Sequence, residues 1–259
     1  MKKFGTMIAA GALAVCLTVG LAACAPISSE ARNTPSEHVT REQWEAYFSD
    51  FDASLENCRI TYETSYAETS YVLGIKYTCT QVQQYEIVHA DGLIYQRRSA
   101  HQTGAYGDVS LDDSEATTEF YVAPNPDDQF GNTLSRYWKN AGGEWSVDLI
   151  TVGSLFDPLD ALPSTDYDDY VYSEDRDGYV LLDDLDGENV VLKFDKNGRL
   201  VAVWQEETSV VTSLGGGVVT SLGGVRTVEQ MNIVIEYGGQ SLTLPEVPAD
   251  DTGAETLSA

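Results

Sequence analysis

Residues 58–80 read CRITYETSYAETSYVLGIKYTCT, and this stretch decides the fold class. Apolar or aromatic side chains alternate with polar ones on both sides of Leu73-Gly74, which is the period of a strand with one buried face. If Cys58 lies opposite Cys79 in an antiparallel hairpin, one face carries the pairs Ile60–Tyr77, Tyr62–Ile75, Thr64–Leu73 and Tyr66–Tyr71. A one-residue slip would exchange the two faces. The hydrophobic pattern and the cysteine positions therefore favour the same register.

The N-terminus has the three parts of an export signal: Lys2 and Lys3, an apolar segment over about residues 7–21, and small residues before Cys24. The apolar segment is shorter than the ~20 residues of a membrane span. The motif Leu21-Ala22-Ala23-Cys24 resembles the lipobox of bacterial lipoprotein precursors. This resemblance implies removal of residues 1–23, lipid attachment to Cys24, and a location on the outer face of the cell membrane. The alternative is an ordinary secretory signal with an unrelated cysteine.

Cysteine usage agrees with export. Cys16 lies in the signal and Cys24 in the lipobox, so Cys58 and Cys79 are the only other pair. In an oxidising compartment such a pair is expected to form a disulfide, which would stabilise the fold by roughly 3 kcal/mol. No CxxC spacing indicates a redox or metal site.

Composition and charge limit the class of partner. The whole chain carries a formal charge of −26, and loss of Lys2 and Lys3 leaves 13 basic against 41 acidic side chains, or about −28. Nucleic acid is excluded as a partner because its phosphates need positive charge. An anionic membrane surface would also repel the body of the protein. The length remaining after residue 23 suits one domain.

The chain divides into a signal peptide (1–23), a flexible tether rich in Pro, Ser and charge (24–39), a single antiparallel β-rich domain (40–247) and a disordered acidic tail (248–259). Thr40 and Gln43 have the spacing of a capping box and predict a helix to about Leu55. Its apolar stripe is formed by Trp44, Tyr47, Phe48 and Phe51. Packing on a sheet is the main interpretation of the stripe, and a binding surface is the alternative.

Further hairpins are predicted along the domain. Asn197-Gly198 is a strong hairpin-turn signal, and a turn over residues 140–143 would set Trp138 against Trp145. The stretch 210–216 (VVTSLGG) recurs at 218–224, which indicates a local duplication. Two copies are too few for a solenoid.

No catalytic motif is present in the sequence, and we predict no enzymatic activity, no cofactor and no metal site. His38, His89 and His101 lack the HExxH spacing, and GxSxG and phosphate-loop patterns are absent. Acidic clusters such as 183–188 are interpreted as solvated turns, because calcium sites need several oxygen ligands at fixed positions.

The order of elements is similar to that of the LolA/LppX-type lipoprotein fold. The residues that carry the resemblance are the 44–51 helix and the 58–79 hairpin, together with 190–204 and 231–245 near the other end. The resemblance implies an α+β, mostly antiparallel fold: a curved open half-barrel sheet with an N-terminal helix and one or two short helices. It also implies a lipid-like ligand on the concave face. The ligand-facing residues would be Trp44, Phe48, Tyr62, Tyr66, Ile75 and Tyr77.

Two functions follow as expectations. In the first, the membrane-anchored protein binds or carries an apolar small molecule or lipid. In the second, it is a non-enzymatic surface module that binds another envelope protein through exposed tyrosines and acidic loops. Co-purifying lipid or an apolar cavity of several hundred Å³ would favour the first.

Overall fold

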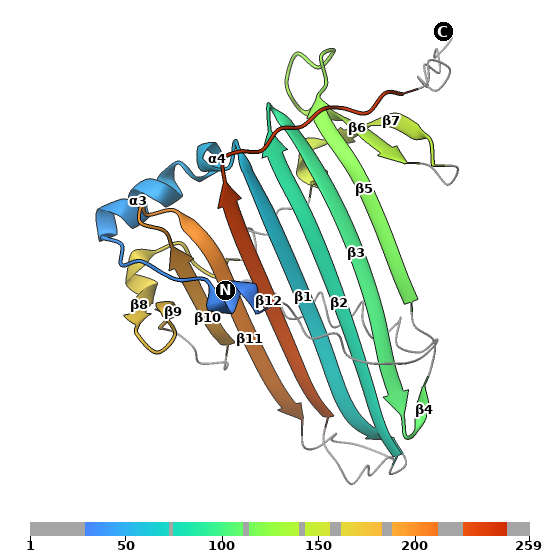
Figure 1. Cartoon of the computed structure of the whole chain (residues 1–259), viewed down its shortest axis with the longest axis vertical. Coiled ribbons are helices and arrows are strands. Elements are labelled where there is room, and N and C mark those ends of the chain that lie inside the picture. The colour runs from blue at the N-terminus through green and yellow to red at the C-terminus, as the bar shows by residue number, and fades with distance from the viewer. Residues whose placement is uncertain are drawn as a thin grey trace.

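The computed structural model describes residues 29–72, 75–110, 114–139, 143–155, 162–182, 188–211 and 225–247. Within these ranges one sheet of twelve antiparallel strands dominates the protein (Figure 1). The strands are β1 (Cys58–Val72), β2 (Ile75–Ala90), β3 (Leu93–Tyr106), β4 (Val109–Ser110), β5 (Ser114–Pro124), β6 (Thr133–Lys139), β7 (Trp145–Thr151), β8 (Tyr170–Ser173), β9 (Gly178–Leu181), β10 (Glu188–Phe194), β11 (Leu200–Val211) and β12 (Val225–Tyr237).

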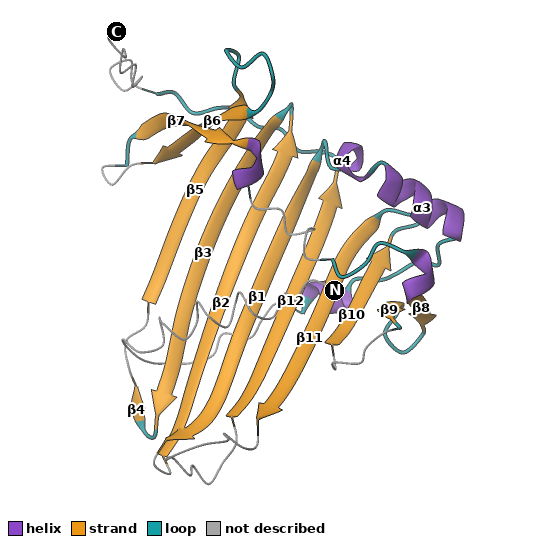
Figure 2. Ribbon diagram, turned by 180° about the vertical axis from the view of Figure 1, so that it is seen from behind, coloured by secondary structure: helices purple, strands orange, loops and turns teal. Residues whose placement is uncertain are grey.

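The sheet grows in two directions from its centre. Its order is β7-β6-β5-β3-β2-β1-β12-β11-β10-β9-β8, with β4 paired to β3. The chain runs outward from β1 to β7, continues at the opposite edge with β8, and returns until β12 pairs with β1 (Figure 2). The sheet is open, with β7 and β8 at its edges. The predicted class, a mostly antiparallel open sheet with little helix, is confirmed.

The helices are short: α2 (Glu30–Asn33), α3 (Arg41–Ser49) and α4 (Phe51–Ser54), with 3₁₀ turns η1 (Val152–Ser154) and η3 (Tyr167–Asp169). The predicted capping box begins α3. Thr40 Oγ1 accepts a hydrogen bond from the Gln43 amide (3.3 Å), and Gln43 Oε1 accepts one from the Thr40 amide (2.8 Å). The predicted helix to Leu55 is broken at Asp50, between α3 and α4.

The apolar stripe of α3 packs on the sheet. Trp44 is completely buried, and its ring lies 4.7 Å from that of Phe194 and 5.2 Å from that of Tyr170. Its indole N–H donates to the Thr165 carbonyl at 2.8 Å, which satisfies the one polar group of the ring. We call the side of the sheet under α3 the helix face. Its core is formed by residues such as Ile60, Leu192, Leu200, Val203, Ile233 and Ile235.

The opposite side of the sheet, here the strap face, carries the segment that was expected to be part of the tether. Residues 29–39 are here called the N-terminal strap. Its first part is docked on this face, where Ala31 is completely buried against Val191, Ala202 and Trp204, and its end reaches the helix face, where Val39 joins the core. The prediction of a flexible tether is therefore wrong over these residues. The domain begins about ten residues earlier than residue 40.

The predicted register of the first hairpin is also wrong. Cys58 pairs with His89, and Cys79 lies opposite Glu68. Measured along β1, Cys58 and the partner of Cys79, Glu68, are ten residues apart, which is about 33 Å at the rise of a strand. The two cysteines are separate, buried thiols in the structure, and the expected disulfide does not form. Because the register differs from the predicted one by ten residues, an even number, the same side chains share a face in both.

A one-residue slip changes the β6–β7 hairpin. Lys139, rather than Trp138, pairs with Trp145, so the two tryptophans point to opposite faces. The Asn197-Gly198 turn is confirmed between β10 and β11, with Gly198 at φ +79°. Cys24 with the rest of the lipobox, residues 183–187, most of the duplicated stretch and the acidic tail lie outside the described residues.

We expect Trp44→Ala to lower the free energy of unfolding by about 3–5 kcal/mol, because it removes a fully buried ring and leaves a cavity. Ile75→Ala, at a side chain that is 41% exposed, serves as the control and should cost under about 1 kcal/mol. Urea denaturation of both variants measures the difference. Equal losses would contradict the packing described for α3.

The two buried thiols give a second prediction. Reductant should leave the urea midpoint unchanged, and thiol reagents should modify Cys58 and Cys79 only after unfolding. If the cysteines were bonded to each other, reduction would instead lower the stability by roughly 3 kcal/mol. That loss would restore the original prediction.

Candidate functional site

The six side chains expected to face a ligand do not form one site. Trp44 and Tyr62 belong to the packed core, and Phe48 packs against it. Tyr66, Ile75 and Tyr77 share the helix face but lie farther along the first hairpin, where Tyr77 is opposite Ser70. At strand rise, Ser70 is about 26 Å from Tyr62. The residues of β2 that lie near Tyr66 on this face, Gln81 and Gln83, are polar.

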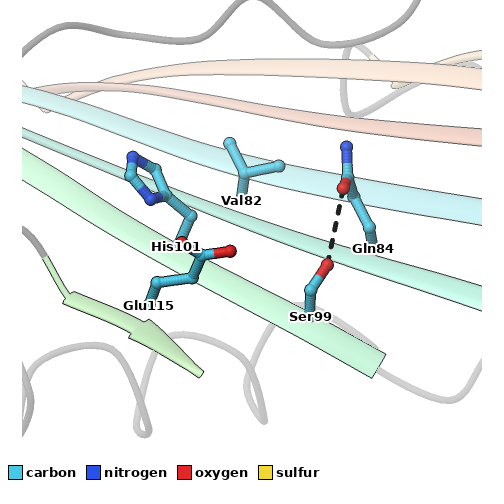
Figure 3. A pocket seen from close by; sticks show the side chains of 5 residues that line it. All are labelled: Val82, Gln84, Ser99, His101 and Glu115. Atoms are coloured by element: carbon cyan, nitrogen blue, oxygen red, sulfur yellow. Dashed lines mark hydrogen bonds between the residues drawn. The ribbon is translucent and has the colours of Figure 1, made fainter. Parts of the chain in front are cut away.

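A pocket of about 230 Å³ lies on the strap face (Figure 3). Val82 and Gln84 come from β2, Ser99 and His101 from β3, and Glu115 from β5. Ser99 Oγ donates to Gln84 Oε1 at 3.4 Å, and His101 is in register with Glu115. Val82 is the one apolar side chain of the five. The pocket is smaller and more polar than a typical ligand cavity of 300–1,000 Å³.

The pocket belongs to a series of polar rows that cross the strap face from strand to strand. One row places Trp204, Asn232, Glu63, Gln84 and Ser99 side by side. Gln84 Nε2 donates to Glu63 Oε2 at 2.6 Å, so the buried carboxylate is held by an amide. In the next row Gln230 Nε2 donates to Glu206 Oε2 at 2.7 Å. Such cross-strand pairs stabilise a sheet whose surface is polar.

Aromatic side chains gather on the strap face toward the β7 edge. The rings of Tyr95 and Tyr121 lie 4.9 Å apart, and those of Tyr121 and Trp145 lie 5.5 Å apart. Tyr137 is in register with Tyr121 on the next strand. Leu149 lies on the same face of β7 and is 63% exposed. We call these five residues the aromatic patch.

Charged groups beside the aromatic patch are paired. The Lys139 ammonium bonds to the Glu119 carboxylate and lies 4.9 Å from the centre of the Trp145 ring. The bond from Lys139 lowers the pKa of Glu119. Tyr95 donates to Glu119 Oε2 at 3.3 Å. Burial, together with the negative charge of Glu119, raises the pKa of Tyr95 to about 12. The tyrosine is therefore a neutral phenol at physiological pH, and the patch offers ring faces beside a fixed ion pair.

Metal ligands and histidines form no centre in the part of the chain that the structure describes. No three His, Cys, Asp or Glu side chains there lie close enough to hold a metal ion. His38 stacks on Tyr172, with ring centroids 3.6 Å apart. Of the described helices, none is long and apolar enough to cross a membrane.

Comparison with known proteins adds no assignment. The chain matches no family model, and no curated protein matches it significantly. The candidate site is therefore defined by its geometry alone.

The aromatic patch was not predicted from the sequence, because its members come from four strands whose registers were unknown. One signal was present in the sequence: apolar and polar side chains alternate over residues 145–149 (WSVDL), in a strand with a single charged residue. The predicted Trp138–Trp145 pair pointed to this hairpin, but it placed both tryptophans on one face. In the structure Trp145 lies on the strap face and Trp138 on the helix face.

Asn232 yields a prediction, because this residue is only 4% exposed and its Oδ1 has no hydrogen-bond partner among the residues that the structure describes. An unsatisfied buried polar atom costs about 1–3 kcal/mol. Asn232→Leu should therefore leave the stability unchanged or raise it by about 1 kcal/mol in urea denaturation. Gln84→Leu, which removes the donor to the buried Glu63 carboxylate, is the contrasting variant and should lower it. A loss of more than about 1 kcal/mol for Asn232→Leu would indicate a bound partner at Oδ1.

Proposed function

We propose that the mature chain is a lipid-anchored, extracytoplasmic binding module that recognises another envelope protein through the aromatic patch. In this proposal Cys24 carries the lipid and the sheet has no enzymatic role. The observation that carries the proposal is the cluster of half-buried rings of Tyr95, Tyr121, Tyr137 and Trp145, with the exposed Leu149, beside the Glu119–Lys139 pair.

The chemistry of the patch is that of a protein interface. Tyr, Trp and Arg dominate binding energy at interfaces, with polar groups around them. Here the tyrosine and tryptophan rings lie together, and paired charges border them. Rings on an open face of the sheet suit a protein better than a small molecule, which needs an enclosing cavity.

The edge strand supports the same conclusion. β7 ends the sheet and pairs with β6 on one side. Its sequence lacks the Lys and Pro residues that commonly protect an edge, and its one charge, Asp148, is bonded to Arg136 at 2.9 and 2.5 Å. An extended segment of a partner can therefore add a strand to β7 while contacting Trp145 and Leu149.

The apolar-ligand function receives less support. Of the six expected ligand-facing residues, Trp44 and Tyr62 are used in core packing, and the region around Tyr66 and Tyr77 is rich in amides. The half-barrel curvature that the LolA/LppX resemblance implies would place the helix face on the concave side. In this proposal the LolA/LppX resemblance concerns the arrangement of strands and helices, and not the binding of a lipid.

Site-specific photocrosslinking in envelope membranes tests the proposal. A photoreactive residue in place of Leu149 should yield one defined protein adduct, whereas the same residue at Val171 should not. Val171 is the matched control because it is 51% exposed on β8, the opposite edge strand. Adding Tyr121→Ala and Trp145→Ala should reduce the adduct at least tenfold, since hot-spot residues each contribute about 2 kcal/mol or more.

Cys24→Ala should move the protein from the membrane fraction to the soluble fraction. Identical adducts at Leu149 and Val171 would contradict the interface. Stoichiometric phospholipid in the purified soluble domain would favour the apolar-ligand function instead.

A further inference from the structure

The N-terminal strap is fixed to the sheet along its whole length. Its short helix α2 packs Ala31 against Val191 and Ala202. Farther along, the Glu37 amide donates to the Phe194 carbonyl at 2.8 Å. The Val39 amide donates to Tyr179 Oη, also at 2.8 Å. These contacts join the strap to strands β9–β11.

Lys193 fastens the middle of the strap. Its ammonium donates to the carbonyls of Arg32 (2.8 Å) and Thr34 (2.6 Å), and the residue is only 2% exposed. The Ser36 amide donates to Asp177 Oδ2 at 3.2 Å. A buried lysine of this kind is costly to leave without acceptors, so undocking of the strap is unfavourable.

Docking of the strap shortens the connection to the lipid. From Cys24 to Ser29, which begins the described part of the strap, there are five residue steps, which span at most about 17 Å. A flexible tether through residue 39 would reach about 50 Å. The strap face at β10–β12 is therefore held close to the membrane, whereas a long tether would let any side of the domain approach it.

The surface at this point carries two arginines. The guanidinium carbons of Arg32 and Arg176 lie 5.1 and 5.3 Å from the centre of the Trp204 ring. Both arginines are exposed on the described surface, and guanidinium groups bind phosphate oxygens well. Glu174, Asp175 and Asp177 share the β8–β9 turn with Arg176. The two guanidinium groups are therefore suited to binding individual phosphates, because the surface around them is not basic as a whole.

We propose that the N-terminal strap orients the domain, with the strap face around Trp204 resting on the headgroup layer of the anchoring membrane. Arg32 and Arg176 contact headgroup phosphates in this arrangement. The proposal rests on the lipid at Cys24 given above. The aromatic patch lies on the same face but up to seven strands away, about 34 Å at the usual strand spacing. It is thus set to the side of the contact with the membrane.

Energy transfer from the lipidated protein to vesicles tests the orientation. The mature protein is reconstituted into phosphatidylglycerol–phosphatidylcholine vesicles that contain an acceptor dye on some headgroups. A donor dye is placed at Glu174→Cys, beside the strap, or at Gln129→Cys, in the β5–β6 loop toward the opposite edge. Transfer should be at least threefold greater from position 174.

Two sets of variants separate the causes. A sixteen-residue Gly/Ser insertion after Ser28 lengthens the connection without touching the strap, and should bring the transfer from the two positions to within a factor of 1.5. Arg32→Gln with Arg176→Gln should reduce the transfer from position 174 at least twofold. The matched control, Arg97→Gln with Arg98→Gln, removes the same charge from β3 and should not.

Equal energy transfer to the vesicle dye from positions 174 and 129, in the protein without the insertion, would contradict the proposed orientation. An equal effect of the two arginine pairs would overturn the phosphate contact. If the protein fails to enter vesicles because it carries no lipid, the lipid-anchor part of the proposed function fails instead, and mass spectrometry of Cys24 distinguishes that case.

Discussion

The pairing of β1 with β12 is the contact on which the rest of the structure depends. Twelve consecutive residue pairs, from Cys58–Tyr237 to Thr69–Arg226, join the first and last long strands in the middle of the sheet. Tyr237 connects this ladder to the core: its hydroxyl donates to the Leu200 carbonyl at 2.7 Å and lies 2.8 Å from the Tyr47 hydroxyl of α3. Without this ladder the two halves, β1–β7 and β8–β12, would be separate sheets with exposed inner edges.

The central ladder is longer than the core that covers it. α3 and α4 cover only one end of the helix face, where Trp44, Ile60 and Ile233 are buried. Beyond this region the helix face continues with threonine, glutamine and tyrosine side chains such as Thr64, Tyr66 and Gln83. On the strap face, cross-strand hydrogen bonds such as Gln84–Glu63 take the place of apolar packing. This division explains why the protein presents broad polar faces. It also explains why the aromatic rings near β7 belong to a surface and not to a second core.

The sequence predicted local features well and long-range ones poorly. The Thr40–Gln43 capping box and the Asn197-Gly198 turn depend on residues a few positions apart, and both were correct. The Cys58–Cys79 register failed because alternation fixes only which face a side chain takes. A shift of ten residues preserves that face, so no feature of the pattern could reject it. The observed strands pair Val72 with Ile75, whereas the expected hairpin turned earlier, between Tyr66 and Tyr71.

The candidate site could not be predicted for a related reason. Each member of the aromatic patch is an ordinary strand tyrosine, tryptophan or leucine by itself, and only the order β3-β5-β6-β7 brings these side chains together. The strap was missed because composition indicated a flexible segment. Its docking depends on Lys193, 154 residues after Val39, whose burial beneath the Arg32 and Thr34 carbonyls no local pattern encodes.

Docking of the strap also changes how the strong negative charge should be interpreted. A body near −28 was expected to be repelled by an anionic membrane. Screening limits that repulsion to about 8 Å at physiological ionic strength.

The sheet, however, spans about 48 Å from β7 to β8 at the usual strand spacing. In the proposed orientation, in which the membrane meets the domain at the strap, most of the carboxylates therefore lie several screening lengths from the membrane. Only the groups around Trp204 are close enough to respond to it: the Arg32 and Arg176 guanidiniums, and the Glu174 and Asp175 carboxylates in the turn of Arg176. The acidic charge is consequently compatible with a short anchor, provided that the domain meets the membrane at this point.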